Sequence, residues 1–298
     1  MRAYKTAAAF REALKARLRA LAKDGPWEPQ QLQRQLAYDR LLERLYLADD
    51  GWIVKGAVAL LARDIGVRAS LDVDVYRATT TEVAESDLRA AAKRDVGDWF
   101  RFDVGTRGVV ADGAAGLRLP VTAYVGDTQW ARFHVDLVGS DLRMTGEPED
   151  VPALALVDMV DIKQGGYHAY PLVDHVADKV AVTIERHGAG EMPSTRFRDL
   201  VDLVAIARGA SVDATAQIAA LTSEARRRGL VLPDRFDVPD RQMWEEGVSG
   251  GSRALLVSSG EGARWSTGRG PTVPRPAARR ERRRNVGPRS GRVGWLSS

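Results

Sequence analysis

The 298-residue chain contains no cysteine, which excludes thiolate metal sites, thiol nucleophiles and disulfides. Histidine is scarce, and we predict no catalytic or metal-binding role for the four that occur, His134, His168, His175 and His187. No apolar run reaches the about 20 residues that a membrane-spanning helix needs, and the N-terminal residues alternate charged and apolar side chains, unlike a secretory signal. These absences favour a soluble, cytoplasmic protein with no membrane partner.

Net charge is distributed unevenly along the chain. Residues 247–298 hold eleven arginines, no lysine and two glutamates, a balance of +9, whereas residues 1–246 carry 33 basic and 38 acidic groups. The segment 247–298 lacks apolar periodicity and is rich in Gly, Ser, Pro and Arg, which predicts a disordered tail. Such an arm could bind RNA phosphates without specificity, but the abrupt change of composition also suits a shifted reading frame.

Apolar periodicity predicts an α+β protein. Helices are expected in "TAAAFREALKARLRALA" and "QQLQRQLAYDRLLERLYLA", strands in "WIVKG" and "SLDVDVYR", a further helix in "TEVAESDLRAAAKR", and a β-hairpin on either side of Gly126-Asp127. From Pro152 onward the pattern predicts helices, most clearly at 172–188, 194–209 and 213–229. We therefore predict a mixed-sheet domain with N-terminal helices at 1–150, a helical domain at 151–246 and the tail.

Two of the predicted strands contain aspartate side chains. Asp72 and Asp74 flank Val73, so both carboxylates project to one side of a strand, about 7 Å apart. In the second hairpin strand, Asp136 shares a face with Trp130, Arg132, His134 and Val138, and could bring a third carboxylate onto a neighbouring strand. Three carboxylates with a pair of Mg²⁺ ions serve phosphoryl and nucleotidyl transfer. The alternative is that the two aspartates belong to a solvated edge strand.

The segment before these aspartates carries a known pattern. A strand that ends at Gly56 and runs into a helix presents free backbone N–H groups, which suit a triphosphate. "KGAVALLARDIGVRASLDVDV" resembles the first motif of the AbiEii-type nucleotidyltransferase toxins, a branch of the DNA polymerase beta-like superfamily. The matching residues are Gly56, Arg68, Ser70, Asp72 and Asp74, while Ala57 replaces a second glycine or serine. "YPLVDHVADKVAVTIER" and "RFRDLVDL" resemble two later motifs, so the likeness spans roughly residues 45–210.

The resemblance implies a nucleotidyltransferase-like mixed β-sheet domain followed by a helical domain, and it implies roles for particular residues. The catalytic residues would be Asp72, Lys179 and Asp199, the ligands of Mg²⁺ (or Mn²⁺) Asp72 and Asp74, and the residues that bind the nucleoside triphosphate Gly56, Arg68, Ser70 and Lys179. The strand pattern adds Asp136 to the metal ligands, and its position just before the glycine adds Lys55 to the phosphate contacts. Considered alone, Lys179 could equally form a surface ion pair. Asp199 and Asp202 could pair with Arg196 or Arg198 on their own helix.

The function implied by the resemblance is a metal-dependent toxin of a toxin–antitoxin pair. It would add nucleotides to RNA, with the acceptor end of tRNA as the expected target and an antitoxin encoded nearby. Two alternatives stay open. A small-molecule nucleotidyltransferase that modifies an antibiotic would use the same metal site, and a frame-shifted gene would leave an inactive folded remnant.

Overall fold

The computed structural model describes residues 3–65, 69–109, 116–139, 143–154, 156–188 and 192–247. The described residues all belong to one compact unit, Met1–Gly260. The predictions for Arg68 and for the tail from residue 248 onward concern positions outside the described residues. Within the described part of the chain, no helix is both long and apolar enough to cross a bilayer.

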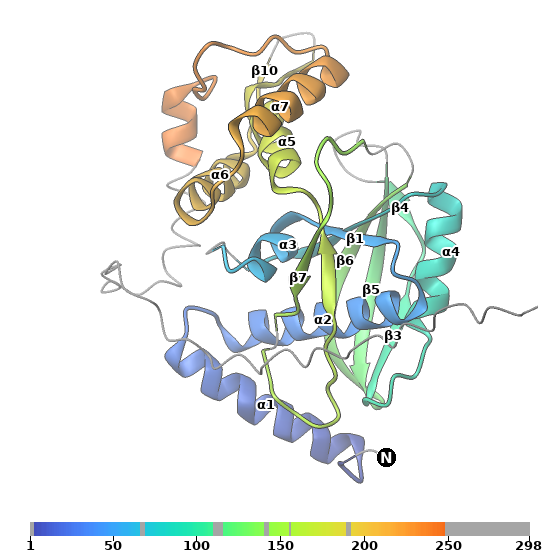
Figure 1. Cartoon of the computed structure of the whole chain (residues 1–298). Helices are drawn as coiled ribbons and strands as arrows, with labels where there is room; N and C mark the ends of the chain where they lie inside the picture. The colour runs from blue at the N-terminus through green and yellow to red at the C-terminus, as the bar shows by residue number, and fades with distance from the viewer. Residues whose placement is uncertain are drawn as a thin grey trace, which may run out of the picture. The chain divides into compact units, whose positions relative to one another are not determined.

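A mixed β-sheet organises the described residues, as the α+β prediction requires (Figure 1). In spatial order its strands are β3 (Phe100–Val104), β5 (Leu117–Val125), β6 (Thr128–Val138), β2 (Asp72–Arg77), β1 (Trp52–Lys55), β8 (Gly166–Ala169) and β7 (Glu149–Pro152), with β4 (Gly108–Val109) paired to β5. The pairs β2–β6 and β1–β8 are parallel and the others antiparallel. The predicted hairpin is confirmed as β5–β6, and Gly126 takes the positive φ of 60° that its turn needs.

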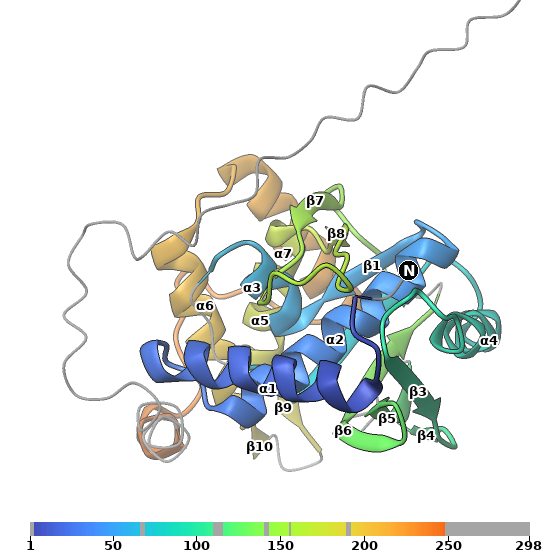
Figure 2. The same ribbon diagram turned by 90° about the horizontal axis from the view of Figure 1, so that it is seen from below.

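Three helices cover one face of the sheet, as Figures 1 and 2 show. They are α1 (Ala7–Asp24), α2 (Pro29–Ala48) and α4 (Thr81–Ala92). The side chains of Thr6 and Thr80 accept backbone N–H groups at the starts of α1 and α4, and a capping box with Glu28 begins α2. Their apolar faces pack on the alternate strand residues that point toward them, among them Val73 and Val135, both fully buried. The other face of β2 and β6 carries Asp72, Asp74 and Asp136, and beyond them Tyr76 and Val138 pack in a small apolar cluster.

Three further helices form a group above the sheet in the view of Figure 1. They are α5 (Leu172–Ile184), α6 (Phe197–Gly209) and α7 (Ala214–Arg228), with the two-stranded ribbon of β9 (Arg186–His187) and β10 (Met192–Pro193) between α5 and α6. Residues 241–247 are also helical. A second apolar cluster joins this group to the short α3 (Gly56–Ala62) through Leu60, Ile65, Leu172 and Ile206. Packing across α3 therefore ties the helices to the sheet.

Two expectations from the sequence are wrong. The helical pattern predicted from Pro152 begins only at Leu172, because the strand β8 intervenes and joins the sheet in parallel beside β1. Trp130 was expected on the face of Asp136, but it packs in the core against Phe100, with its Nε1 donating to the Gln33 carbonyl. A β-bulge explains this, since the hairpin register shifts by one residue at Ala123/Tyr124 and turns Trp130 to the other face.

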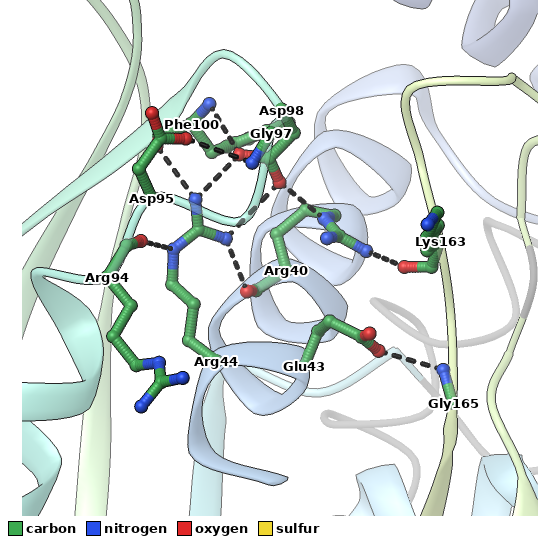
Figure 3. A network of polar contacts seen from close by, with 10 residues as sticks. All are labelled: Arg40, Glu43, Arg44, Arg94, Asp95, Gly97, Asp98, Phe100, Lys163 and Gly165. Carbon is green, nitrogen blue, oxygen red and sulfur yellow. Dashed lines mark hydrogen bonds and ion pairs between the residues drawn. The ribbon is translucent and has the colours of Figure 1, made fainter. Parts of the chain in front are cut away.

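A buried charge network fastens α2 to the rest of the domain (Figure 3). The Arg44 guanidinium lies 2.6 Å from the Asp98 carboxylate and also donates to the Arg94 and Phe100 carbonyls. Arg40 reaches the same Asp98 at 2.8 Å and donates to the Lys163 carbonyl. All three charged side chains are almost fully buried, so their many hydrogen bonds offset the cost of desolvation.

Candidate active site

Four charged residues form a row across four neighbouring strands. Lys55 of β1 is opposite Asp74 of β2, Asp74 is opposite Asp136 of β6, and Asp136 is opposite Arg118 of β5. Residues that pair directly across strands project to the same face, so the row places two carboxylates between two cationic residues. It lies on the face of the sheet opposite the apolar core.

Asp72 adds a third carboxylate on this face, two residues before Asp74. The Arg118 guanidinium lies 2.9 Å from Asp136 Oδ2 and 3.4 Å from Asp72 Oδ2, so it bridges the two strands. Ser70 is buried, and its hydroxyl donates to the Asp72 carbonyl at 2.7 Å, with Asp72 Oδ1 at 3.4 Å. Ser70 thereby fixes the chain where β2 begins.

The negative charges of the carboxylates on this face are only partly balanced by positive charges and hydrogen bonds. Burial and the charges of Asp72 and Asp136 raise the pKa of Asp74 to about 7, although Lys55 and Lys179 oppose the shift. Burial likewise raises the pKa of Asp136, against the effect of Arg118, and Asp136 Oδ1 is buried with no hydrogen-bond partner among the described residues. An additional positive charge would stabilise the ionised forms.

A divalent cation matches this donor set in its chemistry. Mg²⁺ takes carboxylate oxygens, and the unpartnered Asp136 Oδ1 offers one. In the part of the chain that the structure describes, however, no group of three or more His, Asp or Glu side chains is arranged around a common point as a metal site. Arg118 contacts two of the three aspartates in the present arrangement.

Gly56 follows the strand β1 and begins α3 in a conformation that only glycine adopts readily. Its φ is +63°, and a Cβ at this position would lie 2.0 Å from Asp74 Oδ2. The turn therefore packs directly on the Asp74 carboxylate. The sequence predicts a free amide here, but the Gly56 N–H donates to His175 Nε2 at 3.1 Å.

Lys55 is directed toward α5. Its Nζ lies 3.6 Å from Asp178 Oδ2 and 4.1 Å from the centre of the Tyr170 ring. Lys55 and Gly56 thus both contact residues of the helical group, which brings α5 close to the carboxylate row.

Lys179 is buried between two helices and does not form a surface ion pair. Its Nζ donates to Asp199 Oδ1 at 2.7 Å and to Asp202 Oδ2 at 2.9 Å, and only 8% of the residue is exposed. Burial lowers the pKa of Lys179, but the two aspartates outweigh this and raise it. Arg196 donates to the other oxygen of Asp199, so that Asp199 bridges two cations and its pKa is lowered despite burial.

The structure thus brings the predicted residues together in two groups. Asp72, Asp74 and Asp136 share one face of the sheet, and Lys179 with Asp199 joins α5 to α6, near enough for Lys179 to lower the pKa of Asp74. Two residues at the site have no predicted role, Arg118 and His175. Alternation along the strand 116–125 is the one local signal for Arg118, and for His175 the sequence offers none.

A mixed sheet with aspartates on adjacent parallel strands, beside a glycine turn into a helix, defines a nucleotidyltransferase. The family described as nucleotidyl transferase AbiEii toxin, type IV toxin–antitoxin system, matches residues 40–260, and the chain belongs to this family. It is accordingly a nucleotidyltransferase toxin, and membership implies a nucleoside triphosphate substrate and a cognate antitoxin.

One solved structure shares the fold. The chain resembles MenT4, a nucleotidyltransferase toxin from Mycobacterium tuberculosis H37Rv, with a TM-score of 0.53 and 16% identity over 79% of this chain and 87% of that one. JHP933 from Helicobacter pylori is similar at 17% identity and a TM-score of 0.39, over 76% and 92% of the two chains. No curated protein matches the sequence.

Proposed function

We propose that this nucleotidyltransferase toxin is metal-dependent and transfers nucleotides to RNA in the cytoplasm, with the 3′ end of tRNA as the expected acceptor. The observation that carries the proposal is the register of Asp74 with Asp136, which gathers three carboxylates on one face beside the Gly56 turn. The RNA acceptor is inferred from the resemblance of the motifs. Residues 1–150 would supply the metal site, and residues 151–246 the lysine that contacts phosphate.

Asp72, Asp74 and Asp136 are the proposed ligands of Mg²⁺ or Mn²⁺. Support comes from the raised pKa of Asp74 and from the unpartnered Asp136 Oδ1, both of which a bound cation would relieve. Divalent ions held there would polarise the α-phosphate of the nucleotide, where the RNA hydroxyl attacks and pyrophosphate leaves. The chain itself keeps the three side chains on one face and fixes the approach to Asp72 through Ser70.

Lys179 is the proposed principal contact to the nucleotide phosphates. Two of its three N–H bonds are directed to Asp199 and Asp202, which leaves one for an anion. Asp199 holds the ammonium in place and keeps it charged, which is its proposed part in catalysis. Lys55, Ser70, Arg68 and the Gly56 turn are the further proposed contacts to the triphosphate.

The proposal is tested by incubating the protein with each labelled nucleoside triphosphate, Mg²⁺ and total RNA. We expect label in a discrete RNA band, loss of that label with EDTA, and no labelling by Asp72→Asn at an unchanged melting temperature. Asp127→Asn, an exposed carboxylate at the hairpin turn, is the matched control and should label normally.

Other results would reject the proposal. Label that appears only on an added cationic antibiotic would identify the small-molecule enzyme, and a well-folded wild type that labels nothing would identify the inactive remnant. Full activity in EDTA, or in Asp72→Asn, would exclude the metal site at Asp72.

A further inference from the structure

His175 is a buried histidine whose ring contacts the turn at Gly56. It lies one turn into α5, only 3% of it is exposed, and its Nε2 is the acceptor for the Gly56 N–H at 3.1 Å. The two residues are 119 positions apart in the chain, so this is a tertiary contact between the helical group and the sheet.

The Gly56 N–H determines which nitrogen of the His175 ring carries the proton. A backbone N–H can only donate, so Nε2 must present its lone pair and the ring proton must lie on Nδ1. Burial, together with the charges of Lys179, Lys55 and Arg63, holds the pKa of His175 well below its usual range, which keeps the ring neutral. His175 Nδ1 is buried and has no hydrogen-bond partner among the described residues. The hydrogen bond that Nε2 accepts from the Gly56 N–H therefore distinguishes His175 from a leucine of similar size, which could pack there but could not accept this bond.

Gly56 transmits the position of His175 to the carboxylates. The space beside its Cα is filled by Asp74 Oδ2, so a shift of the turn displaces the Asp74 carboxylate. Lys55, the residue before the glycine, is held by Asp178 of the same helix. His175 and Asp178 are three residues apart and lie on one side of α5, which therefore holds both residues of the turn.

The same helix carries Lys179, one turn after His175. Lys179 is fixed by Asp199 and Asp202 of α6, so α5 is also anchored to α6. The distance between Lys179 and Asp74 consequently depends on how firmly the turn is held against α5. Reacting groups must be aligned closely, and a displacement of about 1 Å can cost about 100-fold in rate.

We propose that His175 is a positioning residue for nucleotidyl transfer. By accepting the Gly56 amide through Nε2, it sets the Lys55–Gly56 turn, and with it the Asp74 carboxylate, at a fixed distance from Lys179. The effect on rate rests on the proposed function, whereas the hydrogen bond is a property of the fold and is tested separately.

Two amide substitutions separate this role from simple packing. The Oε1 of glutamine lies about where His175 Nε2 lies, while the Oδ1 of asparagine lies about where Nδ1 lies. We expect His175→Gln to keep kcat within about fivefold of the wild type, and His175→Asn and His175→Leu to lose about 100-fold in kcat. His168→Leu, a change at a more exposed histidine on β8, is the control and should keep its activity.

Amide hydrogen exchange at Gly56 gives a readout that does not require activity. Loss of the acceptor should speed exchange at this amide at least about tenfold in His175→Asn and His175→Leu, but not in His175→Gln. Unchanged exchange in His175→Asn would overturn the hydrogen bond, and altered exchange with undiminished kcat would overturn the positioning role. If the wild type transfers nothing, the proposed function fails, and the exchange rates still decide whether His175 holds the turn.

Discussion

The Asp136 carboxylate of β6 lies directly across from the Asp74 carboxylate of β2, in the register of two parallel strands. Burial raises the pKa values of both aspartates, and like charges add to the shift: Asp72 and Asp136 act on Asp74, and Asp72 acts on Asp136. Lys55 and Arg118 occupy the ends of the same row and offset part of the repulsion. The fold therefore maintains an acidic site before any cation binds.

Arg118 should compete with divalent metal for the aspartates, because its guanidinium contacts both Asp72 and Asp136. We expect Arg118→Gln to lower the stability of the metal-free protein by about 1 kcal/mol, since Arg118 is partly exposed. Added Mn²⁺ should raise the melting temperature of this variant more than that of the wild type. Arg101→Gln, which removes an exposed arginine paired with Asp103, is the control. An equal Mn²⁺-induced rise in wild type and Arg118→Gln would contradict the prediction.

Lys179 should contribute strongly to stability, since its removal leaves two buried carboxylates without their shared cation. Breaking a buried pair in this way costs about 3–5 kcal/mol, so we expect Lys179→Met to lower the free energy of unfolding by that amount. Adding Asp202→Asn should restore part of the loss, because one uncompensated charge is then gone, whereas Asp199 keeps Arg196. Urea denaturation of the two single variants and the double variant measures the coupling. Strictly additive losses would show that the two side chains do not interact.

Asp39 should make stability depend on pH. Burial raises its pKa from 3.8 to about 6 in the folded protein, although the Tyr167 hydroxyl donates to it. The folded state therefore binds the proton more tightly than the unfolded state, so stability is full below about pH 4 and falls by up to about 3 kcal/mol as the pH rises through 6. Asp39→Asn cannot ionise and should lack this part of the decline.

The measurement compares the melting temperatures of wild type and Asp39→Asn at pH 4.5 and pH 7.5. Other groups titrate in both proteins, so the difference between the two proteins is the quantity that reports on Asp39. The variant should gain relative to the wild type as the pH rises. A constant difference across this range would show that Asp39 ionises normally in the fold.

Asp98 should be essential to the attachment of α2, because Arg40 and Arg44 both depend on it. We expect Asp98→Ala to lower the free energy of unfolding by about 3–5 kcal/mol, because it leaves two buried guanidinium groups without a counter-charge. Asp98→Asn keeps the shape and one acceptor and should lose less. Asp103→Ala, at an exposed ion pair, should change stability by less than about 1 kcal/mol. Similar losses in Asp98→Ala and Asp103→Ala would refute the role of the network.

Local periodicity was sufficient to predict much of the fold. The Leu-rich stripes of α1 and α2, the glycine turn of the β5–β6 hairpin and the alternation around Asp72 and Asp74 are all patterns within one element. The strand β8 was not predicted from the sequence. Its four residues are too few to show a period, and its partner β1 lies more than a hundred residues earlier. The buried Arg44–Asp98 pair was missed for a similar reason, since charge in a sequence does not reveal burial.

What the sequence determined by itself is the set of reactive side chains and the order of the elements that carry them, since both follow from residue type and local spacing. Only the tertiary structure determined which of these side chains lie in contact with one another. A two-residue turn at Gly126 without a bulge would pair Arg118 with Val135 and turn it into the core, and the register shift at Ala123/Tyr124 brings it opposite Asp136 instead. Lys179 is buried because α6 supplies two aspartates, and His175 holds Gly56 because α5 packs beside α3. Such contacts depend on packing between distant segments, which no local pattern encodes.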